Sequence, residues 1–312
     1  MGTPEFAATC LKALIDSGEE IAAVFTQPDK ARGRRGNKLM PTPVKELSLQ
    51  HSIPVYQPKS LKAGCEADEL YNTLCELKPE LIVVAAYGKI LPKRILDIPV
   101  HGCINVHASL LPRYRGAAPI QRCILNGEKI TGVTTMLMGE ELDTGDMLLK
   151  EQVEIGENET SSELYIRLAE VGGRLLIDTI TALKAGTLVP EKQDGSQSCY
   201  ADMITKDMCP IDFSDTAENV HHKICGLSES PCALAYSGDK RIKIYHSVLS
   251  DTVSDAKAGT VVDTKLFDVV CGDGRCVRFT EVQTDGGKRM SADAFLRGNK
   301  LEKGSVLTSQ PV

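Results

Sequence analysis

Long hydrophobic runs are missing from this sequence, and so are closely paired cysteines. The longest apolar stretch, residues 81–86 with Ile90 and Leu91 beyond it, is too short to cross a bilayer, and no targeting segment is recognisable. The eleven cysteines are scattered without a Cys-x-x-Cys pair, which argues against a disulfide framework or a cysteine zinc site. We therefore expect a cytoplasmic protein with reduced thiols and no metal.

An overall excess of positive charge is also absent. The formal net charge of −6 argues against a wholly basic nucleic-acid binder, so a polyanionic partner must be held by a local patch. Such a patch occurs within residues 27–43, where cationic residues surround two glycines: Lys30, Arg32, Arg34, Arg35 and Lys38. A glycine-hinged cationic loop suits phosphate oxygens. A solvated surface loop is the alternative interpretation.

The length of 312 residues and a change of pattern near residue 187 predict two domains. Helical and strand-like segments alternate up to residue 186, which predicts an α/β domain with a doubly wound, mostly parallel sheet. Residues 187–205 are polar and irregular and are expected to be a linker. Short strand-like runs with glycine turns follow within residues 206–312, at 233–237, 241–246, 259–264, 267–271 and 276–282, and they predict a small β-barrel.

In the first domain the expected elements include helices at 3–17, 66–77, 117–126 and 160–184, and strands at 21–26, 55–56, 81–86, 103–107, 131–138 and 146–155. Thr3 is the expected N-cap of the first helix, and Thr160 with Glu163 forms a capping box for the last.

The most informative segment is 102–121, in which a short buried strand gives way to a loop broken by Pro112, Gly116 and Pro119. Asn105 and His107 project to the same side of this strand and lie at its carboxyl end, where open α/β sheets bind ligands.

An acidic turn at residues 139–146 supplies Asp143 as a third candidate. Histidine can exchange a proton near neutrality, a carboxylate can orient it, and an amide can donate to a developing oxyanion. Together Asn105, His107 and Asp143 suit acyl transfer to an amine without a covalent intermediate. Ordinary structural roles, as a hydrogen-bonded imidazole and a turn carboxylate, remain the alternative at this point.

The segment 102–121, the turn 142–146, the start Gly2–Phe6 and Gln27–Asp29 resemble the folate-dependent formyltransferases. Residues 35–41 and the C-terminal part are similar to the members of that family that formylate methionyl initiator tRNA. The resemblance covers nearly the whole chain and implies a Rossmann-like first domain and an OB-like second domain. It implies 10-formyltetrahydrofolate as the formyl donor and the methionyl amine of initiator tRNA as the acceptor. A monomer is our default expectation for the oligomeric state.

The resemblance also implies roles for residues. His107 would relay a proton, Asn105 would hold the oxyanion, and Asp143 would orient His107. The folate site would be lined by Ser109, Leu110, Leu111 and Pro112, with a neighbouring wall that includes Tyr87, Gly88 and Ile90. The contacts with the tRNA acceptor stem would come from Arg35, with Arg34 and Lys38 beside it. The barrel would contact mainly phosphates of the tRNA body.

One difference from the family and two rival functions follow from the same residues. The family's chain begins with a short apolar strand that is missing here before Gly2, so we expect unpaired main-chain edges at 21–26 and 81–86. A formyltransferase that acts on a sugar nucleotide or a purine precursor would share the three candidate residues but would not need the basic loop. A tRNA-binding protein that has lost catalysis is the other alternative.

Overall fold

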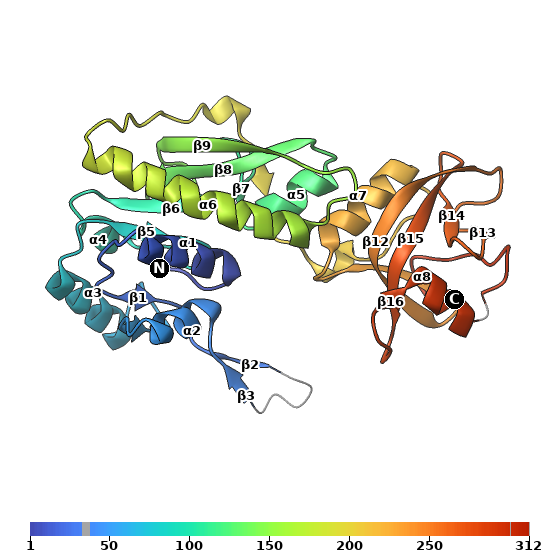
Figure 1. The fold of residues 1–312 in the computed structure, drawn as a ribbon, viewed down its shortest axis with the longest axis horizontal. Helices are drawn as coiled ribbons and strands as arrows, with labels where there is room; N and C mark the ends of the chain where they lie inside the picture. The colour runs from blue at the N-terminus through green and yellow to red at the C-terminus, as the bar shows by residue number, and fades with distance from the viewer. Residues whose placement is uncertain (33–37, 300, 312) are drawn as a thin grey trace. The chain divides into compact units, whose positions relative to one another are not determined.

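The strand that carries Asn105 and His107 is β6 (Cys103–His107), and it lies inside a four-stranded sheet with the order β5-β6-β8-β9 (Figure 1). The structure is a computed structural model and describes residues 1–32, 38–299 and 301–311. β5 (Ile82–Val84) pairs with β6 in parallel, and β8 (Ile130–Leu137) pairs with its other edge antiparallel. The last strand of the sheet is β9 (Met147–Glu154). The apolar side chains of β6, Cys103, Ile104 and Val106, are buried, as the sequence predicts.

A second parallel pair, β1 (Val24–Phe25) with β4 (Val55–Tyr56), lies in the same part of the chain. Residues 1–2 connect it to β5, since Gly2 N donates to Phe25 O at 3.0 Å and Ala85 N donates to Met1 O at 3.0 Å. The prediction that the main chain of 21–26 and 81–86 has unpaired edges is therefore wrong at Phe25 and Ala85. Gly2 is needed there, because a Cβ would lie 2.4 Å from the Ala7 Cβ.

Two helices pack near β6. α1 (Glu5–Asp16) and α6 (Ser161–Lys184) approach each other closely at Gly172, whose Cβ would lie 3.0 Å from Val106 and 3.2 Å from Phe6. A residue without a side chain thus lets α6 pack against both β6 and α1.

The predicted ends of these two helices have different outcomes. The capping box of α6 is confirmed, because Thr160 N donates to Glu163 Oε2 at 2.8 Å and Glu163 N donates to Thr160 Oγ1 at 3.3 Å. The N-cap of α1 is Pro4 and not Thr3. Thr3 Oγ1 instead donates to Tyr87 O at 3.2 Å, which ties the start of the chain to the segment after β5.

Residues 27–43, expected to be an irregular loop, contain an antiparallel strand pair, β2 (Lys30–Arg32) with β3 (Lys38–Met40). The other short elements of this half are α2 (Pro43–Gln50), α3 (Cys65–Leu77), α4 (Lys93–Leu96) and β7 (Arg115–Gly116). Within the part of the chain that the structure describes, no helix is both long and apolar enough to span a membrane.

The chain divides into two compact units that alternate along the sequence. The first unit contains Met1–Gly116, Thr131–Val153 and Tyr165–Tyr200. The second contains Ala117–Ile130, Glu154–Leu164 and Ala201–Val312. Two segments that precede residue 186 thus belong to the second unit, and the domain boundaries at 186 and 205 stay a prediction.

The second unit is built on an antiparallel sheet with the order β11-β12-β15-β14-β13. Its strands are β11 (Ala233–Ser237), β12 (Lys240–Val253), β13 (Val261–Asp263), β14 (Asp268–Val270), β15 (Arg275–Thr284) and β16 (Met290–Ser291). The segment 305–308 pairs with Tyr236 of β11 through Thr308 and with Thr260 next to β13 through Val306. These pairs join the first and last strands, as in a closed barrel. The predicted α/β class with a smaller antiparallel domain is confirmed.

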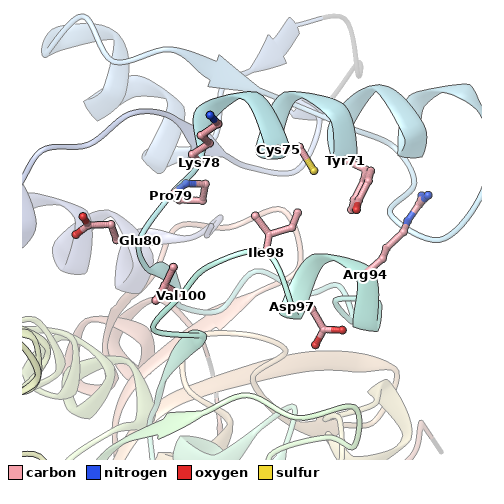
Figure 2. A pocket seen from close by; sticks show the side chains of 9 residues that line it. All are labelled: Tyr71, Cys75, Lys78, Pro79, Glu80, Arg94, Asp97, Ile98 and Val100. Carbon is pink, nitrogen blue, oxygen red and sulfur yellow. The ribbon is translucent and has the colours of Figure 1, made fainter.

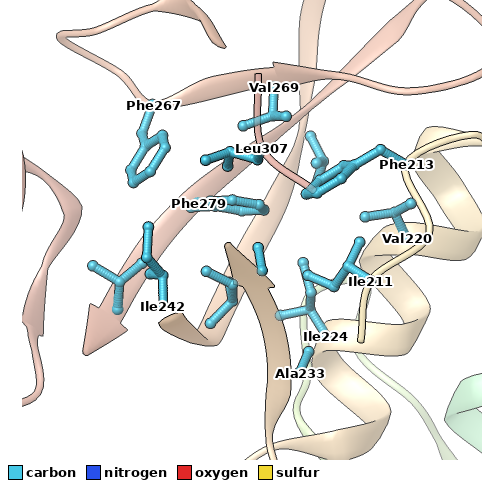
Figure 3. Close-up of a cluster of buried hydrophobic side chains, with 14 of the residues drawn as sticks. Ile211, Phe213, Val220, Ile224, Ala233, Ile242, Phe267, Val269, Phe279 and Leu307 are labelled. Carbon is cyan, nitrogen blue, oxygen red and sulfur yellow. The ribbon is translucent and has the colours of Figure 1, made fainter. Parts of the chain in front are cut away.

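The remaining elements of the second unit are α5 (Pro119–Leu125), α7 (Ala217–Leu227), α8 (Ala292–Gly298) and a 3₁₀ turn at Lys206–Met208. A further 3₁₀ turn at Gly195–Gln197 belongs to the first unit, and β10 (Tyr200–Ala201) contains the last residue of that segment and the first residue of the next. The second unit has its own core, in which Phe213, Phe267 and Phe279 meet aliphatic side chains from α7 and the sheet (Figure 3). The rings of Phe267 and Phe279 are 5.1 Å apart in an edge-to-face arrangement, a favourable geometry for aromatic pairs.

Candidate active site

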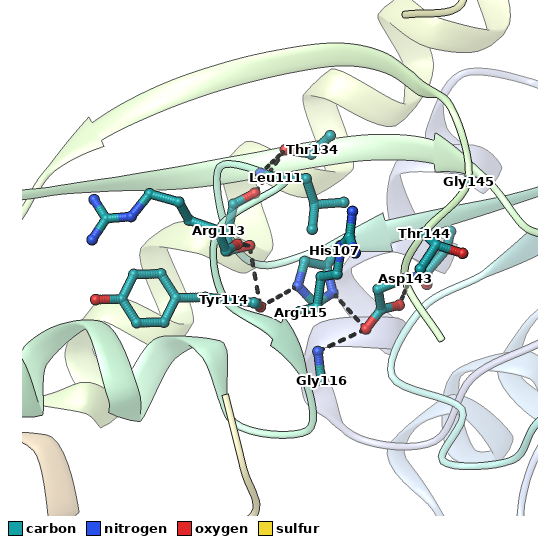
Figure 4. A network of polar contacts seen from close by, with 12 residues as sticks. His107, Leu111, Arg113, Tyr114, Arg115, Gly116, Thr134, Asp143, Thr144 and Gly145 are labelled. Atoms are coloured by element: carbon teal, nitrogen blue, oxygen red, sulfur yellow. Dashed lines mark hydrogen bonds and ion pairs between the residues drawn. The ribbon is translucent and has the colours of Figure 1, made fainter. Parts of the chain in front are cut away.

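The structure brings Asn105, His107 and Asp143 together at the carboxyl end of β6. Figure 4 shows His107 and Asp143 facing each other. Asn105 Nδ2 lies 3.4 Å from Asp143 Oδ1, and His107 Nδ1 lies 3.7 Å from Asp143 Oδ2. The imidazole is 5% exposed and Asp143 is 8% exposed, so the pair is shielded from water. Residues 38 positions apart in the chain thus form one polar cluster, as their chemistry predicts.

The surroundings of His107 determine its tautomer. Its Nε2 lies 2.8 Å from Tyr114 O, and a carbonyl oxygen can only accept a hydrogen bond. Nε2 therefore carries a hydrogen, and Nδ1 is the ring nitrogen that can gain or lose a proton. Nδ1 faces the carboxylate of Asp143 at 3.7 Å.

Asp143 is held by main-chain as well as side-chain contacts. Gly116 N donates to its Oδ2 at 2.9 Å, so one carboxylate oxygen faces both an N–H donor and the imidazole. Asn105 uses one N–H of its amide toward Oδ1, and among the described residues no other partner of this amide is found. The second N–H of Asn105 is free to donate to a substrate oxygen.

Three residues around this cluster have left-handed backbone conformations. Ala86 follows β5 with φ 42°, Tyr114 has φ 59° and Asp143 has φ 53°. Such conformations cost non-glycine residues roughly 1 kcal/mol or more, and they are frequent at functional sites. The cost supports the interpretation that this end of the sheet is shaped for binding and chemistry.

The predicted folate-lining loop after β6 is tied down from within. Thr134 Oγ1 donates to Ser109 O at 2.7 Å, and Leu111 N donates to Thr134 Oγ1 at 3.1 Å. The Ser109 hydroxyl donates to Arg113 O at 2.7 Å, and Leu111 packs in a small buried cluster. Leu110 and Pro112 are partly exposed. The loop therefore offers a fixed surface on which Leu110 and Pro112 are partly accessible apolar side chains.

In the predicted wall of the folate site at residues 87–92, some side chains are buried in the core and others are exposed on the surface. The Tyr87 ring is 2% exposed and belongs to a hydrophobic cluster, while Tyr87 O accepts from Gln27 Nε2 at 2.9 Å. Gly88 has φ 74°, which turns the chain outward. Ile90 is 57% exposed, so it and the main chain are the parts of this wall that can contact a ligand.

Arg34 and Arg35, the predicted contacts with tRNA, lie outside the described residues. Lys38 begins β3, where its main chain pairs with Arg32. The structure thus describes the two strands that carry this basic segment.

Two residues beside the cluster were missed by sequence reasoning. Arg115 lies within the motif, and Gln193 lies in the predicted linker, 50 residues from Asp143. Gln193 Nε2 donates to Asp143 O at 2.9 Å. No periodicity or spacing in the sequence could indicate this contact, because it depends on the tertiary path of an irregular segment.

A cavity of about 580 Å³ lies elsewhere in the first unit, between α3 and the segment around α4 (Figure 2). Tyr71 and Cys75 face it from α3, and Ile98 faces it from the opposite side. None of the predicted site residues lines it. Across the residues that the structure describes, no group of three or more potential metal ligands is found.

Comparison with protein families gives two matches that together span most of the chain. Residues 1–180 match the family described as Formyl transferase, and residues 203–300 match the family described as Formyl transferase, C-terminal domain.

Curated relatives match over their full length. The chain is 47% identical over 314 residues to the methionyl-tRNA formyltransferase of Trichlorobacter lovleyi, covering 100% of this chain and 97% of that protein. It is 47% identical over 308 residues to the methionyl-tRNA formyltransferase of Alkaliphilus oremlandii, covering 98% of each.

Solved structures share the fold at lower identity. The sugar 3N-formyl transferase WlaRD, crystallised with dTDP and 5-N-formyl-THF, aligns with a TM-score of 0.67 at 19% identity, covering 91% of this chain and 95% of that one. An N-formyltransferase from Helicobacter canadensis, in complex with folinic acid and dTDP-3-aminofucose, aligns with a TM-score of 0.64 at 18% identity, covering 91% and 97%.

Proposed function

Because the chain belongs to the formyl transferase family, we propose that it transfers a formyl group from 10-formyltetrahydrofolate to the amino group of methionyl initiator tRNA. Relatives that carry the name methionyl-tRNA formyltransferase align with the chain from end to end at 47% identity. The reaction belongs to translation initiation, which places the enzyme in the cytoplasm. We further propose that it acts as a monomer.

The observation that carries this proposal is the cluster of an amide, an imidazole and a carboxylate at the end of β6. Formyl transfer forms a bond between the amine nitrogen and the formyl carbon and breaks the bond from that carbon to the donor nitrogen. The amine must lose a proton, the formyl oxygen must carry negative charge in passing, and the departing nitrogen must receive a proton. An amide that donates to the oxygen, and an imidazole oriented by a carboxylate that takes up and returns the proton, would meet these needs.

Each residue has a role that follows from its contacts. Asn105 has an N–H free for the formyl oxygen, which develops negative charge. His107 exchanges the proton at Nδ1, since Nε2 is occupied by Tyr114 O. Asp143 faces that nitrogen and stabilises the ring when it is charged. No serine or cysteine nucleophile is required, because the amine attacks the formyl carbon directly.

The surface beside the cluster suits a flat, partly apolar donor. Ile90, on the segment after β5, and Leu142, directly before Asp143, are large apolar side chains with exposed fractions of 57% and 55%. Leu110 and Pro112 add partly exposed apolar groups from the loop after β6. We propose that the folate donor packs on these side chains, next to the main chain of Tyr87 and Gly88, with the tightly held Ser109 and Leu111 keeping the loop in place.

The acceptor is held, in this proposal, by the basic segment and the second unit. Arg35 engages the acceptor stem with Arg34 and Lys38 beside it, and the second unit contacts phosphates of the tRNA body. Arg35→Ala is expected to weaken the productive tRNA complex and to flatten its salt dependence without changing folate binding. Unchanged kinetics with tRNA across a range of salt concentrations would refute the assignment of Arg35.

The direct test is an in vitro assay with formyl-labelled donor and three amines in separate reactions: charged methionyl initiator tRNA, an amino-sugar nucleotide and a purine precursor amine. We expect label only in the methionyl-tRNA. Label in either small amine would favour the rival formyltransferases. Salt-dependent tRNA binding without transfer of label would indicate a binding protein without catalysis.

A further inference from the structure

Gln193 lies in the segment expected to be a linker, yet its side chain contacts the turn that carries Asp143. Its Nε2 donates to Asp143 O at 2.9 Å and to Gly145 O at 2.8 Å. Both N–H groups of one amide are thereby used on one turn. They hold two carbonyl oxygens that flank Thr144, so the main chain of the turn is fixed on either side of its tip.

The other end of the same amide holds Arg115. Gln193 Oε1 accepts from Arg115 Nε at 2.9 Å and from Nη2 at 2.7 Å. Arg115 is 7% exposed, so its guanidinium is largely removed from water and depends on this acceptor. The amide can take only one orientation, because the reversed one would set its oxygen against two carbonyls and its NH₂ against guanidinium donors.

The hydrogen bonds of Gln193 and Arg115 are linked to the carboxylate of Asp143 through Gly116. Gly116, the residue after Arg115, donates its N–H to Asp143 Oδ2 at 2.9 Å. Gln193 therefore connects the main chain of Asp143 with the strand β7 that also fixes its carboxylate. The irregular segment that contains Gln193 makes a second contact with β7, because Cys199 O accepts a hydrogen bond from Arg115 N at 2.9 Å. The left-handed conformation of Asp143 is thus supported at its main chain by Gln193 and at its carboxylate by Gly116.

We propose that Gln193 is a positioning residue of the active site, which fixes the Asp143 turn so that the carboxylate faces Nδ1 of His107. The inference rests on the proposed function, since it concerns the rate of that reaction. Among the hydrogen bonds of the described residues, those of Gln193 go to Asp143, Gly145 and Arg115, and none goes to His107 or Asn105. A small displacement of an orienting group can cost about 10²-fold in rate, because the reacting geometry is narrow.

The sharpest substitution is Gln193→Glu in the full chain. It retains an oxygen acceptor for Arg115, and it replaces the two N–H donors with an oxygen that faces the carbonyls of Asp143 and Gly145. We expect kcat for formylation of methionyl initiator tRNA to fall about 10- to 100-fold. The KM values for tRNA and for 10-formyltetrahydrofolate are expected to change less than about twofold, because no substrate contact is removed.

Gln197→Glu is the matched control. Gln197 lies in the same segment, and its Nε2 donates to Asp194 Oδ2 at 2.9 Å in an exposed turn. It makes no contact with residues 143–145 among the interactions of the described residues, so its kcat is expected to equal that of the wild type. A double variant, Gln193→Glu with Asp143→Ala, is expected to be no slower than Asp143→Ala alone, because Gln193 acts through Asp143.

The outcomes separate this inference from the proposed function. A wild-type protein without activity toward methionyl initiator tRNA would refute the proposed function itself. Wild-type activity with an unchanged kcat in Gln193→Glu would refute only the positioning role. A parallel change in kcat, both KM values and the unfolding midpoint would also refute it, because it would indicate general loss of structure. If Gln193→Glu does not fold, Gln193→Asn, one methylene shorter, is expected to lower kcat with unchanged KM values, and an unchanged kcat would refute the role.

Discussion

At His107 the two ring nitrogens have different surroundings, and this difference decides which one takes part in chemistry. Nε2 is committed to Tyr114 O at 2.8 Å, whereas Nδ1 faces Asp143 Oδ2 at 3.7 Å. The sequence predicts that these residue types belong together, because strand periodicity puts Asn105 and His107 on one side. It cannot predict the tautomer, which depends on a carbonyl from an irregular loop.

The buried hydroxyl of Tyr87 gives a prediction about stability. Its Oη is buried and has no hydrogen-bond partner among the residues that the structure describes, and burial raises the pKa of this phenol to about 12. Tyr87→Phe removes an unsatisfied polar group from a hydrophobic cluster, so the free energy of unfolding is expected to rise by about 1 kcal/mol with activity retained. Chemical denaturation monitored by circular dichroism measures the change.

Tyr165→Phe is the matched control for Tyr87→Phe. Tyr165 Oη accepts a hydrogen bond from Phe6 N at 2.9 Å, so its removal leaves a main-chain donor at the start of α1 without its partner. The free energy of unfolding is expected to fall by roughly 1–2 kcal/mol. Equal losses in the two variants would contradict the different surroundings described for the two hydroxyls.

At the scale of the secondary-structure elements, the turn between β8 and β9 positions Asp143, and Gly145 makes the turn possible. A Cβ on Gly145 would lie 1.7 Å from Leu137 O, a separation that no side chain tolerates. Gly145→Ala is expected to lower the free energy of unfolding by roughly 1–3 kcal/mol and to lower kcat, because the turn must move. Denaturation and steady-state formylation assays measure both effects.

Gly139→Ala tests the same turn without the clash. A Cβ on Gly139 would meet nothing within 4 Å, so stability is expected to change by less than about 0.5 kcal/mol and kcat to stay unchanged. If both substitutions were equally harmful, the close approach at Gly145 would not be the cause.

The elements that the sequence predicts well are those with strong apolar patterns. β6 and β11 have the expected bounds, and α6 differs from its expected start only by its capping residue. α2 was missed because only Val44 and Ser48 of its eight residues are buried, which leaves too little apolar periodicity. β12 runs to Val253, beyond the expected end at His246, because its last part is polar and its pairing with β15 decides its length.

The site shows a similar division. The proximity of Asn105, His107 and Asp143 could be predicted from residue type and position, whereas their catalytic roles stay a prediction. The contacts of Gln193 could not be predicted, because 50 residues separate it from Asp143 and no regular element carries it. The Tyr87 ring was expected in the folate wall, but it points into the core, and a strand-to-loop transition does not reveal side-chain direction.

At the scale of the molecule, stability depends on pH through buried ion pairs, and Asp268 of the second unit is the clearest case. Burial opposes its ionisation, but hydrogen bonds from Arg278, Ser250 and Thr252 outweigh this effect and lower the pKa of the carboxyl. A carboxyl with a lowered pKa in the folded state stabilises above the unfolded value near 3.9, and the contribution is lost as pH falls through the folded value.

Asp268→Asn is therefore expected to destabilise the protein by roughly 1–3 kcal/mol at pH 7, because Arg278 loses its charged partner. The difference from the wild type is expected to shrink as pH falls below about 4, because the Asp268 carboxyl of the unfolded chain takes up a proton there while the folded one, with its lowered pKa, is still ionised. Denaturation curves between pH 3 and pH 7 measure it. A difference that stays constant over this range would contradict the account of Asp268.

The central claim is that the cluster at the end of β6 performs formyl transfer to methionyl initiator tRNA. The most direct measurement is the single-turnover rate of that transfer at saturating tRNA, for the wild type, His107→Ala and Asp143→Ala, with tRNA affinity measured in parallel. We predict rates about 10²- to 10⁴-fold below the wild type for both variants, with tRNA affinity nearly unchanged. Wild-type rates in either variant, or losses explained by weaker tRNA binding, would contradict the claim.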